Sequence, residues 1–440
     1  MRPLAGLPRR GRYKASYAGA VTAAALTSRD AAARTVTTVR SDEAGALLDL
    51  LPTADALSWV RRGEGMVAWG EAARLEVSGP RALAEASAWW SDYTAGLHVE
   101  DELDVPGSGP VLFASIAFDP AAGTSVFVVP EVVVGRRNGV GWVTTIGGAA
   151  RLPFAAAEPD DAPPPRLRYA DGALDPATWC AAVATAVERI ADDEVAKVVL
   201  ARDLLVSADR PLDPRRLLRR LAARFPDCWT FAVDGLLGAT PELLLRRTGR
   251  QLSARVLAGT APRGAGADDR RLAEALISSP KDRAEHALAV DSLVRALEPY
   301  CTTLDAPAEP ELLTLANVRH LASDVAGIQR SRGPRGGAGL LELIGAVHPT
   351  AAVCGTPTRA AAAVIAELEG MDRGRYAGPV GWLDARGDGE FGLALRCAEL
   401  IGDDSARLFA GCGIVAGSEP AAELAETQSK FAAFQAALEG

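Results

Sequence analysis

Strands joined by short turns alternate with long helices in the second half of this 440-residue chain. Apolar segments predict strands at 195–205, 228–233, 243–247, 252–257, 379–383 and 390–400. The stretches between them predict helices at 176–192, 214–224, 280–297, 359–368 and 420–438. Adjacent strands with short turns pair antiparallel, so the pattern predicts an α+β fold rather than a doubly wound parallel sheet.

A proline-rich segment at 155–166 divides the chain into an N-terminal part, 35–165, and a C-terminal part, 166–440. Proline fixes φ and removes a donor, so this segment is predicted to be a linker or a long surface crossing. The N-terminal part predicts a helix at 81–93 and strands at 111–117 and 125–129. Residues 1–34 are predicted to be a disordered extension, with a weak signal or transit peptide as the alternative.

Composition argues against several classes of protein. The formal net charge of −9 disfavours nucleic acid as a partner. The six cysteines lie far apart without a C-x-x-C pair, which is typical of free thiols in the cytoplasm. No apolar run approaches the roughly 20 residues that span a bilayer.

Common catalytic motifs are missing from the sequence, which has no P-loop, nucleophile elbow or H-E-x-x-H. Gly411, Gly413 and Gly417 resemble the G-x-G-x-x-G fingerprint of dinucleotide-binding proteins, but the last two glycines are one residue too far apart. With only four histidines, a metal site would be built from carboxylates. Such ligands favour magnesium, manganese or calcium.

Two charged residues lie in apolar surroundings. Lys197 lies inside an apolar strand, and is either a solvated edge residue or a buried group. Burial would disfavour its charged form and allow it to act as a base near neutrality. Glu242 precedes three leucines, which predicts either an ordinary strand-end glutamate or a general acid with a raised pKa.

Two acidic pairs occur near helix starts with the same three-residue spacing. Asp282 and Glu285 follow a predicted Ser279 cap, and Glu423 and Glu426 begin the last helix. The simplest interpretation of the second pair is a surface salt bridge from Glu426 to Lys430. The alternative is that both acidic faces converge on one hard cation with open positions for substrate oxygens.

Anion-binding groups form the last set of candidates. Arg396, within the predicted strand 390–400, either faces solvent or grips a carboxylate. Gly411, Cys412 and Gly413 are predicted to form a turn that offers backbone N–H groups to an anion. These residues alone indicate a magnesium-type enzyme that acts on a small polycarboxylate.

In their order and amino-acid sequence, several segments resemble those of the chorismate-utilising enzymes. This family includes isochorismate, salicylate, anthranilate and aminodeoxychorismate synthases. The matching segments run in the family's order over about 250 residues, from 197 to 430. They include Lys197-Val-Val-Leu-Ala-Arg202, Leu257-Ala-Gly-Thr-Ala-Pro-Arg-Gly264, Lys281-Asp-Arg-Ala-Glu-His286, Arg375-Tyr-Ala-Gly-Pro-Val-Gly-Trp382 and Glu423-Leu-Ala-Glu-Thr427.

The resemblance implies one large α+β domain of two packed, mainly antiparallel sheets flanked by helices, so 155–166 would cross within that domain. It also implies Mg²⁺ bound by Glu285 and Glu426, with Asp282 and Glu423 in or near the surrounding shell. The resemblance further implies that Glu242 is the general acid and that Lys197 is the base that activates water. The residues implied to hold chorismate are Thr260, His320, Tyr376, Arg396, Gly411, Cys412, Gly413 and Lys430.

Two positions separate the members of this family by nucleophile. Lysine at 197 and alanine at 258 imply water, so the resemblance implies isochorismate synthase, with salicylate synthase as the alternative and a catalytically silent chorismate-binding protein as a further one. It implies a cytoplasmic monomer without a glutamine amidotransferase subunit. The sequence leaves open whether the product enters menaquinone or siderophore synthesis.

Overall fold

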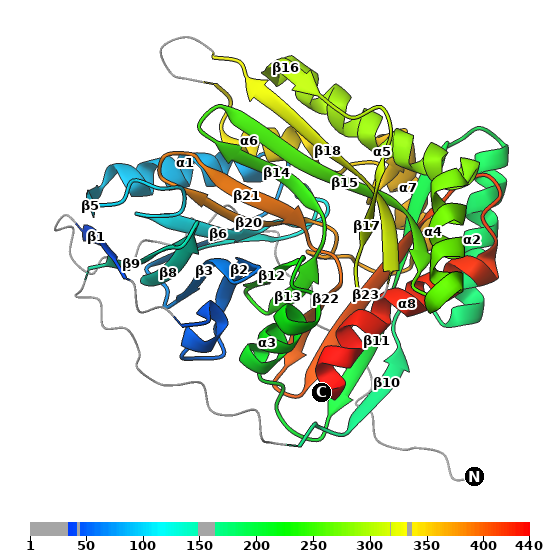
Figure 1. Cartoon of the computed structure of the whole chain (residues 1–440), viewed down its shortest axis with the longest axis horizontal. Coiled ribbons are helices and arrows are strands. Elements are labelled where there is room, and N and C mark those ends of the chain that lie inside the picture. The colour runs from blue at the N-terminus through cyan, green and yellow to red at the C-terminus, as the bar shows by residue number, and fades with distance from the viewer. Residues whose placement is uncertain (1–33, 42–44, 148–162, 317, 332–336) are drawn as a thin grey trace. The chain divides into compact units, whose positions relative to one another are not determined.

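A computed structural model describes residues 34–41, 45–147, 163–316, 318–331 and 337–440. Residues 33–440 form one compact unit, built from two large, mainly antiparallel sheets with helices beside them (Figure 1). The predicted α+β class is therefore confirmed. The predicted extension, apart from Arg34, and residues 155–162 of the proline-rich segment lie outside the described residues.

The first sheet contains thirteen strands within the described ranges, and only its β1–β5 pair is parallel. Twelve of them lie in the order β10 (Leu167–Asp171), β11 (Lys197–Ala208), β23 (Ser405–Ile414), β22 (Cys397–Gly402), β13 (Leu236–Thr240), β12 (Trp229–Val233), β2 (Leu57–Arg61), β3 (Glu64–Trp69), β8 (Val132–Arg137), β9 (Val140–Ile146), β1 (Arg34–Arg40) and β5 (Leu97–Asp101). The thirteenth, β19 (Gly355–Thr356), pairs with β11.

The second sheet has ten strands in the described part of the chain. Nine of them lie in the order β16 (Cys301–Asp305), β18 (Val318–Gln329), β15 (Gln251–Pro262), β14 (Leu243–Thr248), β21 (Gly389–Leu393), β20 (Pro379–Asp384), β6 (Val111–Ser115), β7 (Ser125–Val129) and β4 (Ala73–Val77), while β17 (Glu311–Thr314) pairs with β18. Both sheets combine strands from before and after the proline-rich segment, because β2 pairs with β12 and β6 with β20.

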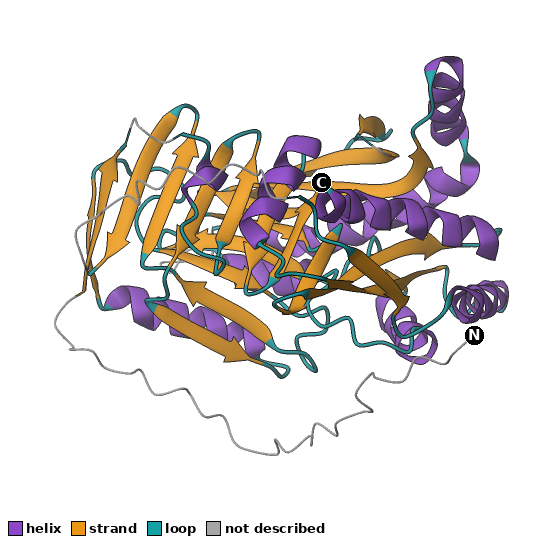
Figure 2. Ribbon diagram, turned by 90° about the horizontal axis from the view of Figure 1, so that it is seen from below, coloured by secondary structure: helices purple, strands orange, loops and turns teal. Residues whose placement is uncertain are grey.

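The helices pack alongside the two sheets (Figure 2). The first sheet contacts α2 (Pro176–Ala191), α3 (Pro214–Arg224), α7 (Thr358–Leu368) and α8 (Pro420–Glu439). The second contacts α1 (Ala82–Ala95), α4 (Gly266–Ser278), α5 (Pro280–Leu297) and α6 (Leu340–Val347). No helix in the described ranges is long and apolar enough to cross a membrane.

Most predicted helices are confirmed to within a few residues, and Ser279 caps α5 through Oγ as expected. The strand predicted at 390–400 is wrong as a single element, because β21 and β22 belong to different sheets. Residues 394–396 cross between the sheets beside Pro241 and Glu242, which cross between β13 and β14. Arg396 therefore lies in a connection, with φ of +50°, and not in a strand.

Along one edge of β11, side chains rather than another strand form hydrogen bonds with part of the backbone. Between its pairings with β19 and β10, the Ala201 N–H donates to Glu369 (2.7 Å) and the Ala201 carbonyl accepts from Trp179 (3.1 Å). Arg373 forms a buried ion pair with Glu369 and donates to the Val199 carbonyl (2.8 Å). These contacts fix the backbone two to four residues beyond Lys197.

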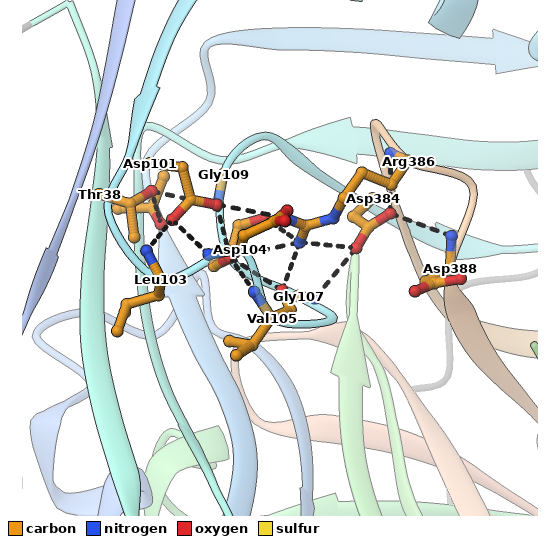
Figure 3. Close-up of polar contacts among 12 residues, drawn as sticks. Thr38, Asp101, Leu103, Asp104, Val105, Gly107, Gly109, Asp384, Arg386 and Asp388 are labelled. Carbon is orange, nitrogen blue, oxygen red and sulfur yellow. Dashed lines mark hydrogen bonds and ion pairs between the residues drawn. The ribbon is translucent and has the colours of Figure 1, made fainter. Parts of the chain in front are cut away.

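A second network, of which Asp384 is the buried member, joins the loop after β5 to the turn between β20 and β21 (Figure 3). Arg386 contacts Asp104 (2.8 Å), Asp384 (3.1 Å) and Asp101 (3.3 Å), and these four residues are called the Arg386 clasp below. Asp384 also accepts from the backbone N–H of Gly107 at 3.1 Å.

Candidate active site

The predicted site residues gather around one pocket where α5 and α8 meet the two sheets. About 710 Å³ of space, part of it open to solvent, lies among the residues that line the pocket. It is lined by eleven of the predicted residues: Glu242, Thr260, Glu285, His320, Tyr376, Arg396, Gly411, Cys412, Gly413, Glu426 and Lys430. The other three, Lys197, Asp282 and Glu423, lie beside lining residues.

Lys197 is fully buried on β11, so the solvated-edge alternative is wrong. Its Nζ lies 3.0 Å from Glu285 Oε1, close enough for an ion pair but not aligned as a hydrogen bond. A Cβ at position 413 would lie too close to Glu285 Oε1 and 3.0 Å from Lys197 Cε, so the glycine leaves room for both side chains in these positions. The arrangement places a lysine amine directly behind a pocket carboxylate.

The N-terminal turns of α5 and α8 carry four carboxylates whose charges influence one another. Burial raises the pKa of Asp282, and the charges of Glu285 and Glu423 raise it further. Burial also raises the pKa of Glu426, although Lys430 opposes this and Glu423 adds to it. Glu423 pairs with Lys281 at 2.9 Å.

The predicted Glu426–Lys430 contact forms at 2.6 Å, but it lines the pocket and is not a surface pair. Lys430 Nζ also donates to the Gly411 carbonyl at 2.7 Å. Within the described residues, no three histidine, cysteine or carboxylate side chains converge as a complete metal cage. Two pocket carboxylates with open positions around them suit a hard cation that keeps sites for water and substrate.

Glu242 lies in the crossing between the two sheets and is 5% exposed. Burial raises the pKa of its carboxyl group to about 8, although the positive charges of Lys197, Lys430 and Arg396 oppose the rise. A carboxyl with this pKa is largely protonated at neutral pH and can donate a proton.

A hydrogen-bonded chain runs along the opposite side of the pocket. Arg396 contacts His320 Nε2 at 3.0 Å, and His320 Nδ1 lies 3.1 Å from Thr260 Oγ1. Burial holds the pKa of His320 well below its usual range, so the ring is neutral. Because a guanidinium can only donate, Nε2 must accept and Nδ1 carries the hydrogen toward Thr260.

Gly411, Cys412 and Gly413 lie inside strand β23, so the predicted turn is wrong. The Gly411 carbonyl accepts from Lys430 and therefore faces away from the neighbouring strand β11. Side alternation along a strand then places the N–H groups of Gly411 and Gly413 on the same side. Tyr376 stacks on Phe409 nearby, with ring centroids 4.8 Å apart.

Arg373 also lines the pocket and was not among the predicted site residues. Its position four residues after Glu369, at the end of a helical segment, was the available sequence signal. Because the same spacing usually marks an exposed pair, sequence alone did not distinguish it from a surface contact.

Comparison with known proteins agrees with this geometry. Residues 148–439 match the family model described as "Chorismate binding enzyme". The chain belongs to the chorismate-binding enzymes. Among its relatives in this family, isochorismate synthase MenF of Bacillus subtilis is 34% identical over 373 residues, covering 78% of each chain.

Two further members of the family are also similar to this chain. Isochorismate synthase DhbC of Bacillus subtilis is 42% identical over 269 residues, covering 58% of this chain and 66% of the relative. The crystal structure of MenF, the menaquinone-specific isochorismate synthase from Escherichia coli, superposes with a TM-score of 0.76 and 25% identity. That match covers 92% of this chain and 95% of MenF.

Proposed function

We propose that this protein is an isochorismate synthase, which interconverts chorismate and isochorismate with water as nucleophile and is therefore an isomerase. The observation that carries the proposal is Lys197, fully buried beside the pocket with Ala258 in the pocket lining. In the family this combination of lysine and alanine goes with water rather than ammonia or an enzyme lysine. The relatives named isochorismate synthase support the same assignment.

Glu285 and Glu426 would hold Mg²⁺, with Asp282 and Glu423 behind them. Their chemistry fits this ion, because Glu285 and Glu426 present carboxylate oxygens to the pocket and hard cations prefer oxygen ligands. A bound Mg²⁺ would supply charge stabilisation for the ring carboxylate of chorismate and orient it.

The protein's own groups would hold the rest of the substrate. Arg396 and Tyr376 are assigned to the enolpyruvyl carboxylate, while Lys430 and the 411–413 segment are assigned to the ring carboxylate. Thr260 and His320 would line the ring. The Arg396–His320–Thr260 chain supports this assignment, because it holds the guanidinium in one orientation before substrate arrives.

Proton transfers would be divided between two buried groups. Lys197, in its neutral amine form, would take a proton from water as the water oxygen attacks the ring carbon beside the one that bears the carboxylate. The ring double bonds shift and the original hydroxyl departs with a proton from Glu242. The raised pKa of Glu242 supports its role as the acid, because it carries that proton at neutral pH.

Chromatography of products from purified protein, chorismate and Mg²⁺, with and without chelator, tests the proposal. Isochorismate in equilibrium with chorismate, lost on chelation, is the expected result. Salicylate and pyruvate would instead identify a salicylate synthase, and no consumption would identify a silent binding protein. An aminated product with ammonia would point to a missing amidotransferase subunit.

The finer assignments form part of the same proposal. We expect a monomer without an amidotransferase partner, whose product enters menaquinone or catechol siderophore synthesis. Six free cysteines, five of them buried, suit a reducing compartment such as the cytoplasm.

A further inference from the structure

A second pocket, separate from the candidate active site, is rich in arginine. Five arginines line it, together with two carboxylates, Glu64 and Glu390. This group is called the arginine pocket below and consists of Arg61, Arg62, Arg136, Arg137 and Arg246. Its cavity volume is about 260 Å³, and it shares no lining residue with the active-site pocket.

The charge in this pocket is opposite to that of the chain as a whole. The sequence carries 56 acidic against 47 basic residues, so a random pocket would hold slightly more acids than bases. Five guanidinium groups around one small cavity therefore form a local concentration of positive charge. Such a concentration attracts anions.

The carboxylates of the pocket do not neutralise this charge. Glu390 is 5% exposed and accepts from Trp59 Nε1 (3.0 Å), Arg137 (3.0 Å) and Arg246 (3.2 Å). One carboxylate is thus shared by two guanidinium groups, which leaves one positive charge in excess. Arg62 pairs with Asp227 at 2.6 Å.

Arg61 and Arg136 are held by neutral groups. The Arg61 guanidinium lies 4.2 Å from the Trp229 ring centroid and donates to the Asp227 carbonyl at 2.8 Å. Arg136 donates to the Gly45 carbonyl at 2.9 Å. These contacts orient both side chains without cancelling their charge, and neither forms an ion pair with a carboxylate of the described residues. Burial lowers the pKa of Arg61, and the charges of Arg255, Arg62 and Arg246 lower it further, as expected for crowded cations.

We propose that the arginine pocket binds a small molecule that carries a carboxylate or phosphate group. Guanidinium groups recognise both anions through paired N–H donors, and here several are oriented before a ligand arrives. The ligand's negative charge would balance the excess that Glu390 leaves. The site is additional to the one proposed for chorismate.

Isothermal titration calorimetry of the full chain, with sodium phosphate or sodium malonate at constant ionic strength, tests this proposal. One saturable binding event is expected that persists in Arg396→Gln, in which the active site is weakened. Arg136→Gln should weaken that event about tenfold or more, because it loses a charged hydrogen-bond donor. The anion that binds more tightly identifies the recognised group as phosphate or carboxylate.

Arg81→Gln is the matched control, since Arg81 is 81% exposed before α1 and outside the pocket. Arg62→Gln, whose side chain is 68% exposed, provides a second pocket variant with little risk to folding, and melting temperatures check both. Absence of saturable binding by either anion would overturn the proposal. So would unchanged affinity in both pocket variants, or loss of the event in Arg396→Gln.

Discussion

The two main clusters of acidic side chains in this protein differ in how their charge is balanced. In the Arg386 clasp, one guanidinium contacts three aspartates, and backbone N–H groups occupy remaining oxygens. Burial raises the pKa of Asp384, but the Gly107 N–H and Arg386 both oppose that rise. The three carboxylates outnumber the one guanidinium, but Asp104 faces solvent and the buried Asp384 is held by Arg386 and by backbone N–H groups.

The acidic faces of α5 and α8 are not balanced in the same way. There the neighbours of Asp282 and Glu426 include other carboxylates, and burial together with this mutual charge raises their pKa values. Lys281, Lys430 and Lys197 pair with Glu423, Glu426 and Glu285, so four carboxylates face three lysines and one negative charge is left beside the pocket. A closed cluster stabilises the fold, whereas an open one is suited to binding a cation.

The largest effect on catalysis is expected for Glu242, the proposed general acid. Glu242→Gln keeps the size of the side chain but removes its proton, so kcat should fall about 100- to 10,000-fold. Steady-state product formation measures this. The variant's melting temperature should not fall, because glutamine avoids the cost of charging a buried carboxyl. Activity near that of the wild type would contradict the assignment.

The pH profile of the wild type should reflect the same group. With the pKa of Glu242 near 8, the protonated acid is lost above that pH, so kcat should fall about tenfold per pH unit. Since its folded pKa lies above its unfolded value of 4.5, the associated stability is present below pH 4.5 and lost as pH rises toward 8. Rates followed between pH 6 and 10 test the first statement, and urea unfolding at the same pH values tests the second.

Stabilisation by Mg²⁺ should depend on the acidic faces of α5 and α8 and not on the Arg386 clasp. Mg²⁺ at about 100 times its dissociation constant should stabilise the wild type by about 2.7 kcal/mol, because it binds only the folded state. Glu285→Gln should abolish that gain, whereas Arg386→Met should retain it. Thermal unfolding with Mg²⁺ or chelator measures the difference, and an equal gain in Glu285→Gln would place the cation elsewhere.

The smallest effect is expected at the closed cluster. Arg386→Met removes the shared partner of three aspartates and leaves Asp384 buried, which should cost about 2–3 kcal/mol of unfolding free energy. Kinetic constants of the folded enzyme should stay unchanged because the clasp lies outside the pocket. Arg295→Gln, an exposed i,i+4 arginine on α5, is the control and should cost under about 0.5 kcal/mol. If the two variants were equally stable, the clasp would carry no structural role.

The sequence alone determined the fold class, most of the helices and eleven of the residues that line the pocket, which include all of its charged and polar side chains except Arg373. Helix periodicity and capping are local, so α5 begins at its predicted cap and presents Asp282 and Glu285 on one face. The order of the family segments then identified residues that local chemistry left ambiguous. Glu242 and Lys197 are examples, since each had an ordinary alternative from its neighbours alone.

Tertiary structure decided which of these alternatives holds, because burial and charge balance depend on residues distant in sequence. Lys197 is buried because Glu285 of α5 and Gly413 of β23 lie against its side chain. The apparent strand 390–400 divides because the hydrogen-bond partners of its two halves belong to different sheets. Arg396 is turned into the pocket by that crossing, which no local pattern of apolar residues could reveal.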